Sequence, residues 1–254
     1  MTRSALALAI LLLPLQGAAQ RRLAQDTLSP DVPSAVTCGF CAGERFGVIF
    51  RELPSPFRGV VPADFPIVPE AIEVAMASAD NSTSTCTPSS QAATIMASVE
   101  LYAGTTLQDA SIMAEPADGE WTGETLVWAA DAPLMLSTAD GGGRYSLNFN
   151  SLVVRDDMSM PIRIESGSYL RVSVTIPAGA AGSSPMCEPM YMSPAGFPFR
   201  DEGRVAPKRS FIYAAGVGWL WNEDAGVGGD WGIRMTIFAE GSGMPDAGTP
   251  DAGR

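Results

Sequence analysis

The side chains with the most evident chemistry in this chain are four cysteines. Cys38 and Cys41 are separated by two residues, whereas Cys86 and Cys187 lie far apart in the sequence. The Cys-x-x-Cys spacing occurs in redox enzymes and in halves of zinc sites. A thioredoxin-like enzyme needs a βαβ context, which is absent after this pair, and a four-cysteine zinc site needs a second close pair. We therefore expect all four cysteines to form structural disulfides.

The pairing of these cysteines is a separate question, because four cysteines allow three connectivities. Loop-closure entropy alone slightly favours joining both Cys38 and Cys41 to the distant cysteines. Geometry favours the local pair, since a turn at Gly39 brings its α-carbons within the roughly 7 Å that a disulfide spans. We predict the disulfides Cys38–Cys41 and Cys86–Cys187. Non-reducing peptide mapping distinguishes the three pairings.

Two tryptophans are candidates for ligand contact. Trp219 and Trp221 are two residues apart, so in a strand their side chains face the same way. A pair of aromatic rings on one sheet face could stack on sugar rings. Large aromatic side chains more often supply core burial, which is the interpretation that we favour for this pair.

The loop that follows these tryptophans carries oxygen-bearing side chains among glycines. Asn222, Asp224 and Asp230 are hard ligands of the kind that calcium prefers. Their spacing does not match an EF-hand, so an ordinary polar loop is the favoured interpretation. We predict neither a bound metal nor a cofactor.

The composition excludes several classes of enzyme. The chain has no histidine among its 254 residues, and Lys208 is its only lysine. A Ser-His-Asp triad, a Cys-His pair and a histidine-ligated metal are therefore impossible. Glycoside hydrolysis by two carboxylates needs no histidine, but the spacing of the 28 acidic residues does not single out a pair. The net charge of −12 argues against a nucleic-acid partner. We expect a protein that is not an enzyme.

The elements that must position these side chains are strands. Aliphatic residues alternate with polar ones, most clearly at 95–102, 170–176 and 231–237. This period of two is typical of half-buried strands. Weaker alternation occurs at 46–50, 126–128, 134–136, 145–149 and 211–213. Turn-forming Gly, Pro, Asn and Asp separate about nine such segments, which predicts an all-β, antiparallel, two-sheet sandwich.

Two segments fit this pattern less well. Residues 69–77 contain good helix formers after a proline, but Ile72, Val74 and Met76 alternate, so we favour a strand. The Pro- and Gly-rich stretch 177–208 is the least regular part of the chain. We interpret it as a surface connection.

The N-terminal segment has the features of an export signal. A positive residue, Arg3, precedes the apolar run Ala5–Leu15, and small residues follow at 17–19. We predict a signal peptide at 1–19 that is cleaved after Ala19. The apolar run is shorter than the ~20 residues that a transmembrane anchor needs. The expected location is the periplasm, the cell surface or the extracellular medium.

The remaining boundaries follow from composition. Residues 20–37 are polar and contain two prolines, which suggests a spacer before the sandwich domain at 38–240. Residues 241–254 repeat Asp-Ala-Gly and carry no large apolar residue after Met244. Such a tail cannot bury enough surface to offset its ordering entropy, so we expect it to be disordered.

Short motifs give the middle of the chain a resemblance to a known kind of module. They are Val99-Glu-Leu-Tyr-Ala-Gly-Thr105, Leu170-Arg-Val-Ser-Val174, Trp219 and Gly229-Asp-Trp-Gly-Ile-Arg234. In this order they resemble the jelly-roll-like β-sandwich modules of exported and surface proteins from GC-rich Gram-negative bacteria. The resemblance implies a non-catalytic accessory or surface role, and it transfers no site residue.

The sequence therefore favours an exported, non-catalytic protein with a binding or structural role. A glycan or another surface protein is the expected kind of partner. The alternative is a secreted carboxylate-type glycoside hydrolase or a carbohydrate-binding module.

Overall fold

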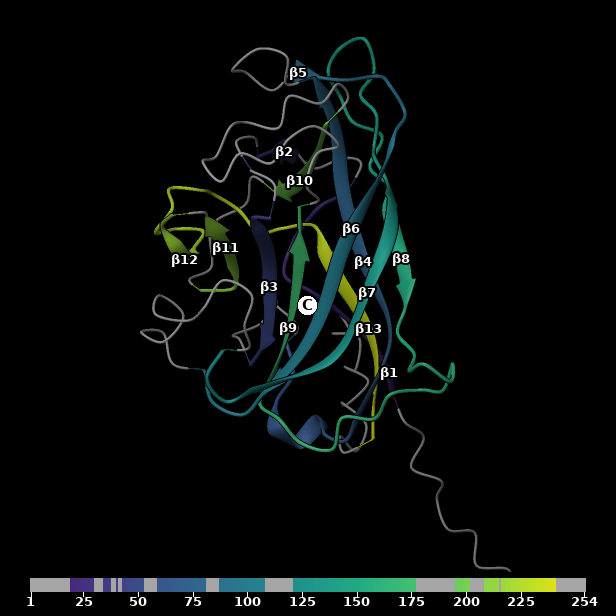
Figure 1. Cartoon of the computed structure of the whole chain (residues 1–254), viewed down its shortest axis with the longest axis vertical. Helices are drawn as coiled ribbons and strands as arrows, with labels where there is room; N and C mark the ends of the chain where they lie inside the picture. The colour runs from purple at the N-terminus through teal and green to yellow at the C-terminus, as the bar shows by residue number, and fades with distance from the viewer. Residues whose placement is uncertain are drawn as a thin grey trace, which may run out of the picture.

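Two antiparallel sheets make up the described part of the chain (Figure 1). The computed structural model describes residues 19–29, 34–37, 40, 43–52, 59–80, 87–107, 121–176, 195–201, 208–214 and 216–240. Within these ranges it contains strands and one short 3-10 helix, η1 (Pro62–Asp64), and no α-helix. No helix of these ranges is long and apolar enough to cross a membrane. The expected all-β, two-sheet architecture is confirmed.

The first sheet is built around one long central strand. Its order is β1 (Ala19–Ala24), β13 (Ile233–Ala239), β4 (Ile67–Asp80), β10 (Ala195–Asp201) and β2 (Ser34–Val36). Two further strands also pair with β4, namely β5 (Thr87–Pro88) and β8 (Phe149–Val153).

The second sheet has six strands and lies in front of β4 and β13 in Figure 1. Its order is β12 (Gly218–Trp221), β11 (Ser210–Ala214), β3 (Arg45–Arg51), β9 (Tyr169–Thr175), β6 (Thr94–Gly104) and β7 (Glu124–Met135). β7 is the edge strand on one side.

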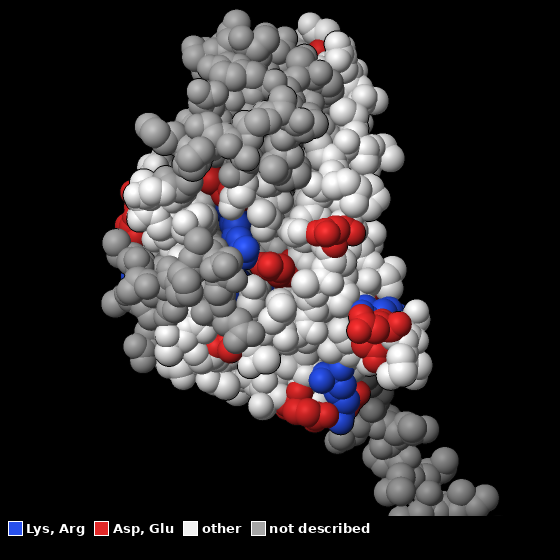
Figure 2. Space-filling view, in the orientation of Figure 1, with Lys and Arg blue, Asp and Glu red and all other residues white. Residues whose placement is uncertain are grey.

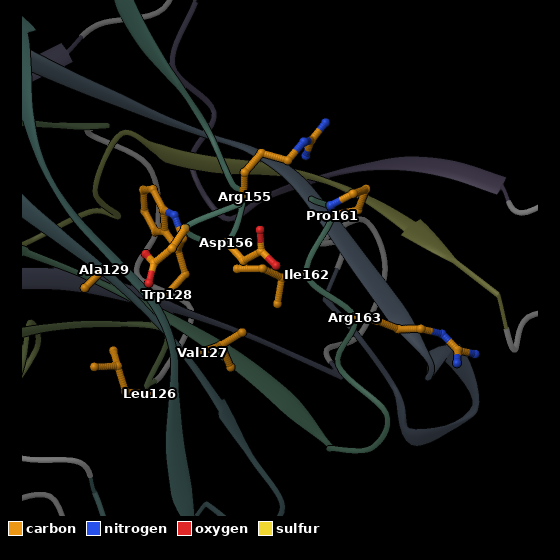
Figure 3. Close-up of a pocket in the computed structure, with 10 residues that line it drawn as sticks. Leu126, Val127, Trp128, Ala129, Arg155, Asp156, Pro161, Ile162 and Arg163 are labelled. Carbon is orange, nitrogen blue, oxygen red and sulfur yellow. The ribbon is translucent and has the colours of Figure 1, made fainter. Parts of the chain in front are cut away.

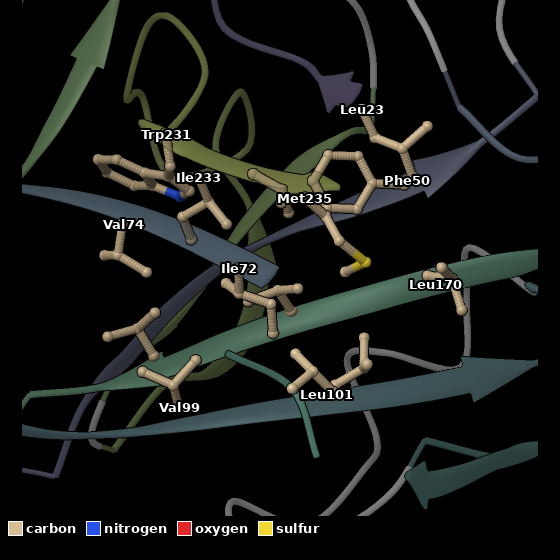
Figure 4. Packing of buried hydrophobic residues seen from close by; sticks show 14 of the residues in the cluster. Leu23, Phe50, Ile72, Val74, Val99, Leu101, Leu170, Trp231, Ile233 and Met235 are labelled. Carbon is tan, nitrogen blue, oxygen red and sulfur yellow. The ribbon is translucent and has the colours of Figure 1, made fainter. Parts of the chain in front are cut away.

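The main core lies between the two sheets. Along β13 the residues alternate strictly between buried and half-buried, as the period of two predicts. Figure 4 shows Ile233 and Met235 pointing from β13 toward Val99, Leu101 and Leu170 of the second sheet. All five side chains are buried, so burial of apolar surface holds the two sheets together.

The strand predicted over 69–77 is confirmed as part of β4. Its helix formers do not prevail, because Ile72, Val74 and Met76 are buried on one side of the strand and pack into the core. β4 pairs with β13 on one side and with β8 on the other. This pairing stabilises the extended backbone more than helix propensity would stabilise a helix.

The interpretation of residues 20–37 as a spacer differs from the structure, because this segment contributes β1 and β2. β1 pairs with β13 from Ala19 to Ala24, and Leu23 is fully buried in the main core. The alternation was hard to see because Leu23 is the only large apolar residue of the strand. Its inward-facing neighbour Arg21 is instead satisfied by an ion pair with buried Asp64, at 2.5 Å.

The stretch 177–208 is also less irregular than expected, because it contains β10. This strand pairs with both β4 and β2, and its Phe197 and Phe199 are buried. Gly196 and Pro198 interrupt the sequence pattern without preventing pairing, since both keep an antiparallel partner on β4.

A loop between Val154 and Ile164 lies beside the edge strand β7. The chain leaves the edge of β4 at Val154, whose N–H bonds to Glu70, and rejoins it at Ile164, which exchanges two hydrogen bonds with Ile67. We call the intervening residues 155–163 the excursion.

Candidate functional site

The structure places the two candidate stacking tryptophans in the interior. Trp219 and Trp221 are 1% and 2% exposed, on the outer side of the second sheet. They pack edge-to-face against Trp121, which is itself buried. The pair therefore offers no exposed stacking surface. It belongs to a second, aromatic core, as the favoured interpretation of these tryptophans expects.

This aromatic core surrounds a fully buried cation. The Arg171 guanidinium lies 3.9 Å from the ring centre of Tyr102 and 4.2 Å from that of Trp121. It donates hydrogen bonds of 2.5 to 2.9 Å to both carboxylate oxygens of Glu124, and neither side chain is exposed. Burial, followed by the negative charge of Glu124, raises the pKa of Tyr169 beside them. The cluster is a structural ion pair enclosed by aromatic rings.

The three candidate calcium ligands do not converge. Asn222 is buried and donates to the carbonyl of Gly229 at 3.1 Å, whereas Asp224 is exposed. Asp230 is held by Arg209 at 2.6 Å and by the Ser210 hydroxyl at 2.7 Å. Within the described ranges, no group of three or more acidic side chains could hold a metal ion. Asp230 is therefore engaged in a buried protein network.

That network joins the residues after β1 to the end of β10 and to the start of β13. Asp201 accepts a hydrogen bond from the backbone N–H of Asp230 at 2.8 Å and two more from Thr27, at 2.7 and 3.0 Å. Asp26, one residue earlier, binds the Arg234 guanidinium at 2.6 Å. Burial raises the pKa of Asp230 to about 7, and Arg209 only partly opposes this shift.

The four cysteines lie outside the described residues, and so do the predicted signal peptide before Ala19 and the tail after Glu240. The disulfide pairing stays a prediction.

An open groove lies on the described surface, between the edge strand β7 and the excursion. It has a volume of about 540 Å³, within the ~300–1,000 Å³ of typical ligand pockets. We call it the β7 groove, and it is lined by Leu126–Ala129, Arg155–Asp157 and Pro161–Arg163. Figure 3 shows Val127 and Trp128 on the β7 side, and Asp156 and Ile162 on the side of the excursion.

A β-bulge shapes the β7 wall of this groove. Leu101 of β6 pairs with Trp128 and the next residue, Tyr102, pairs with Leu126, so Val127 is an extra residue. A bulge locally bends and twists a strand and changes the direction of its side chains. Val127 and Trp128 pack partly against the main core, and the rest of their surface lines the groove.

A rigid turn shapes the opposite wall. The Asp156 carboxylate accepts hydrogen bonds from the backbone N–H groups of Met158 and Met160, at 3.0 and 2.7 Å. Ser159 has a φ of 62°, in the left-handed region, which closes the turn. This arrangement is a side-chain-stabilised turn, and it fixes the wall before any ligand arrives.

The two guanidinium groups of the groove differ in their partners. Arg163 is paired with Glu165 at 3.0 Å and with Glu240 at 2.7 Å. Arg155 donates to the carbonyl of Val154 at 2.7 Å, and no carboxylate of the described residues forms an ion pair with it. Its other N–H donors are therefore available to a ligand.

The charges on the described surface do not form a large patch of one sign on the face shown in Figure 2. Blue and red groups lie close together there, in small clusters surrounded by uncharged atoms. The net charge of −12 therefore does not produce a continuous acidic surface on this face.

Sequence reasoning did not find the groove. Trp128 belongs to an alternating segment that was assigned to a strand, and residues 156–157 were assigned to a turn; both assignments hold. The missing information was that the edge of one sheet lies beside a loop from the other. A signal was present in the paired Asp156-Asp157 next to Arg155, but nothing in the sequence linked it to Trp128.

Comparisons with known proteins give no relative. No family model matches the chain, and neither a curated protein nor a solved structure is detectably similar to it.

Proposed function

We propose that this chain is an exported, non-catalytic binding protein with a jelly-roll-like sandwich, and that the β7 groove is its binding site. The observation that carries the proposal is the groove itself. A half-buried indole, the Asp157 carboxylate and an Arg155 side chain that has no ion-pair partner among the described residues line one hollow. Apolar surface beside hydrogen-bonding side chains in one hollow is a feature of ligand sites.

A role without catalysis agrees with the composition and with the chemistry of the groove. The chain lacks histidine, and its single lysine, Lys208, lies outside the groove lining. Of the two neighbouring carboxylates in the groove, Asp156 is occupied by two backbone N–H groups of its own turn. A carboxylate engaged in this way is suited to holding the wall in place.

Export agrees with the position of β1. Cleavage after Ala19 leaves Gln20 as the first residue, and the pairs from Gln20–Phe238 to Ala24–Arg234 stay intact. The mature chain would thus begin with the strand that closes the first sheet. N-terminal sequencing of the secreted product is expected to start at Gln20.

The binding role is tested with a variant that fills the groove. Ala129 is exposed and lines the groove, so Ala129→Trp is expected to occupy the site without disturbing the core. The matched control is Ala92→Trp, an exposed alanine in front of β6. The purified mature protein and both variants are screened against an oligosaccharide array and a peptide array.

We expect the wild type and Ala92→Trp to bind the same array members, and Ala129→Trp to lose them. Binding that survives Ala129→Trp, or an absence of binding to both arrays, would overturn the assignment of the groove. A parallel assay with chromogenic glycosides tests the hydrolase alternative. Turnover that disappears when one acidic residue is changed would overturn the non-catalytic role.

A further inference from the structure

The outer edge of β7 tells which class of ligand the groove can take. The N–H and the C=O of Met135 both bond to the Asn150 side chain, at 2.7 and 2.9 Å, so they point away from β6. The N–H of the next residue, Leu136, instead bonds to Ala93, on the β6 side, at 2.9 Å. Because backbone direction alternates, the groups of Pro133, Asp131 and Ala129 also point outward from β6.

This edge is unsuited to a peptide that would add itself as a further strand. Asn150 occupies the groups of Met135, Pro133 has no N–H to donate, and the bulge at Val127 ends the regular spacing. Only Asp131 and Ala129 are left with a full outward-facing donor and acceptor pair in register. Proline and bulges are the devices by which proteins protect sheet edges. Recognition in the groove must therefore come from side chains.

The side chains of the groove combine an apolar surface with hydrogen-bonding groups. Trp128 and Val127 on one wall and Ile162 on the other supply flat or aliphatic contacts. Arg155 supplies N–H donors, and Asp157 is an exposed carboxylate that can only accept. A sugar ring matches this set, because its C–H face packs on an indole while each hydroxyl both donates and accepts.

The charges of the groove disfavour an anionic ligand. Arg163 is already neutralised by Glu165 and Glu240. The other charged groups of the lining are Arg155 and two carboxylates, Asp156 and Asp157. One positive and two negative groups leave a net negative charge, which disfavours an anionic ligand.

We propose that the β7 groove binds a neutral oligosaccharide. Trp128 is the surface on which one sugar ring packs, and Arg155 and Asp157 are the groups that bind its hydroxyls. This inference rests on the proposed function, since it names the ligand class of the same groove.

The test measures binding by saturation-transfer NMR and calorimetry, with neutral oligosaccharides, acidic oligosaccharides and ten-residue peptides as probes. The polar variants Arg155→Gln and Asp157→Asn change exposed or half-buried groups, so both are expected to fold. Arg144→Gln and Asp224→Asn are their exposed controls, because neither residue lines the groove. Trp128→Phe retains an aromatic ring, whereas Trp128→Ala removes it.

We expect a neutral oligosaccharide to bind, and Arg155→Gln and Asp157→Asn to weaken it roughly tenfold or more each, as the loss of a hydrogen bond to a charged group predicts. Both controls retain wild-type affinity. Trp128→Phe is expected to bind and Trp128→Ala not to bind, with circular dichroism showing which variants are folded.

The two proposals fail in different ways. Peptides or acidic sugars that bind wild type and are lost in Ala129→Trp would leave the groove as a binding site and overturn the neutral-oligosaccharide inference. Neutral sugars that bind Arg155→Gln, Asp157→Asn and Ala129→Trp as well as wild type would overturn both. An absence of binding to all three probes would also overturn both.

Discussion

At the scale of single residues, the buried ion pair between Arg171 and Glu124 is expected to contribute to the stability of the aromatic core on the second sheet. Both side chains are fully buried among aromatic rings, so a charge that loses its partner there is not solvated by water. Breaking one partner of such a pair is far more costly than replacing both, because the remaining charge stays buried.

Glu124→Gln is therefore expected to lower the free energy of unfolding by about 3–5 kcal/mol. The double variant Arg171→Met with Glu124→Leu is expected to lose less, since it leaves no buried charge. Chemical denaturation measures both, with Glu165→Gln of an exposed pair as the control, for which a change of about 0–1 kcal/mol is expected. A double variant less stable than Glu124→Gln would contradict this account.

Asp230 makes stability depend on pH near neutrality. Burial raises its pKa in the folded state to about 7, from an ordinary value of 3.8. The folded protein thus holds this proton more tightly than the unfolded chain. The stability gained from protonation is fully present below pH 3.8 and is lost as the pH rises through about 7.

We expect the contribution of this group to fall between pH 4 and 8, by at most about 1.4 kcal/mol per pH unit. Asp230→Asn cannot ionise and resembles the protonated carboxyl, so its free energy of unfolding is expected to change less with pH across this window. Denaturation series at several pH values compare the slopes. An unchanged slope in Asp230→Asn would show that another group titrates there.

At the scale of elements, β1 is more than a segment in front of the domain. Its Leu23 lies in the main core, whereas the adjacent Arg22 is half exposed and pairs with Glu73 on the surface. Removing a buried leucine side chain costs the transfer free energy and leaves a cavity.

Leu23→Ala is expected to lower the free energy of unfolding by about 2–5 kcal/mol. Arg22→Ala, its neighbour on the same strand, is expected to change it by about 1 kcal/mol or less. Equilibrium denaturation measures the free energy of unfolding of both variants, and a large difference between them is expected for a strand that packs into the core. Equal, small effects of the two changes would favour the spacer.

The sequence predicts those elements whose inward residues are all apolar. β9 and β13 were readable because aliphatic side chains fill every inward position. β1 was missed because charged Arg21 takes an inward place, and its partners, the Asp64 carboxylate and the Gly59 carbonyl, lie far along the chain. β10 was missed because a glycine and a proline replace bulky residues at paired positions.

The sequence did not predict the groove, because the groove depends on contacts between segments that are distant in the chain. Its walls come from β7 and from the excursion that leaves the edge of β4, so it exists only when the two sheets are stacked. Periodicity reports which way a residue faces within its own strand. It does not report which strand becomes an edge or which loop lies beside it.

At the scale of the whole molecule, the first and last strands hold one another in place. β13 lies between β1 and β4, so β13 must be in place before β1 can pair with it. The network of Asp26, Asp201 and Asp230 adds a second link between the same regions. Such non-local pairing is slow, and we expect folding in roughly milliseconds to seconds.

This arrangement also predicts that the two sheets unfold together. Leu101 of the second sheet and Ile72 of the first belong to one buried cluster, so a cavity at either site weakens the same interface. Leu101→Ala and Ile72→Ala are each expected to cost about 2–5 kcal/mol and to shift one common transition. Far-UV circular dichroism and tryptophan fluorescence are the two probes, because the fluorescence of Trp219 and Trp221 reports mainly on the second sheet. Two separated transitions, with Ile72→Ala moving only one of them, would show that the sheets are independent units.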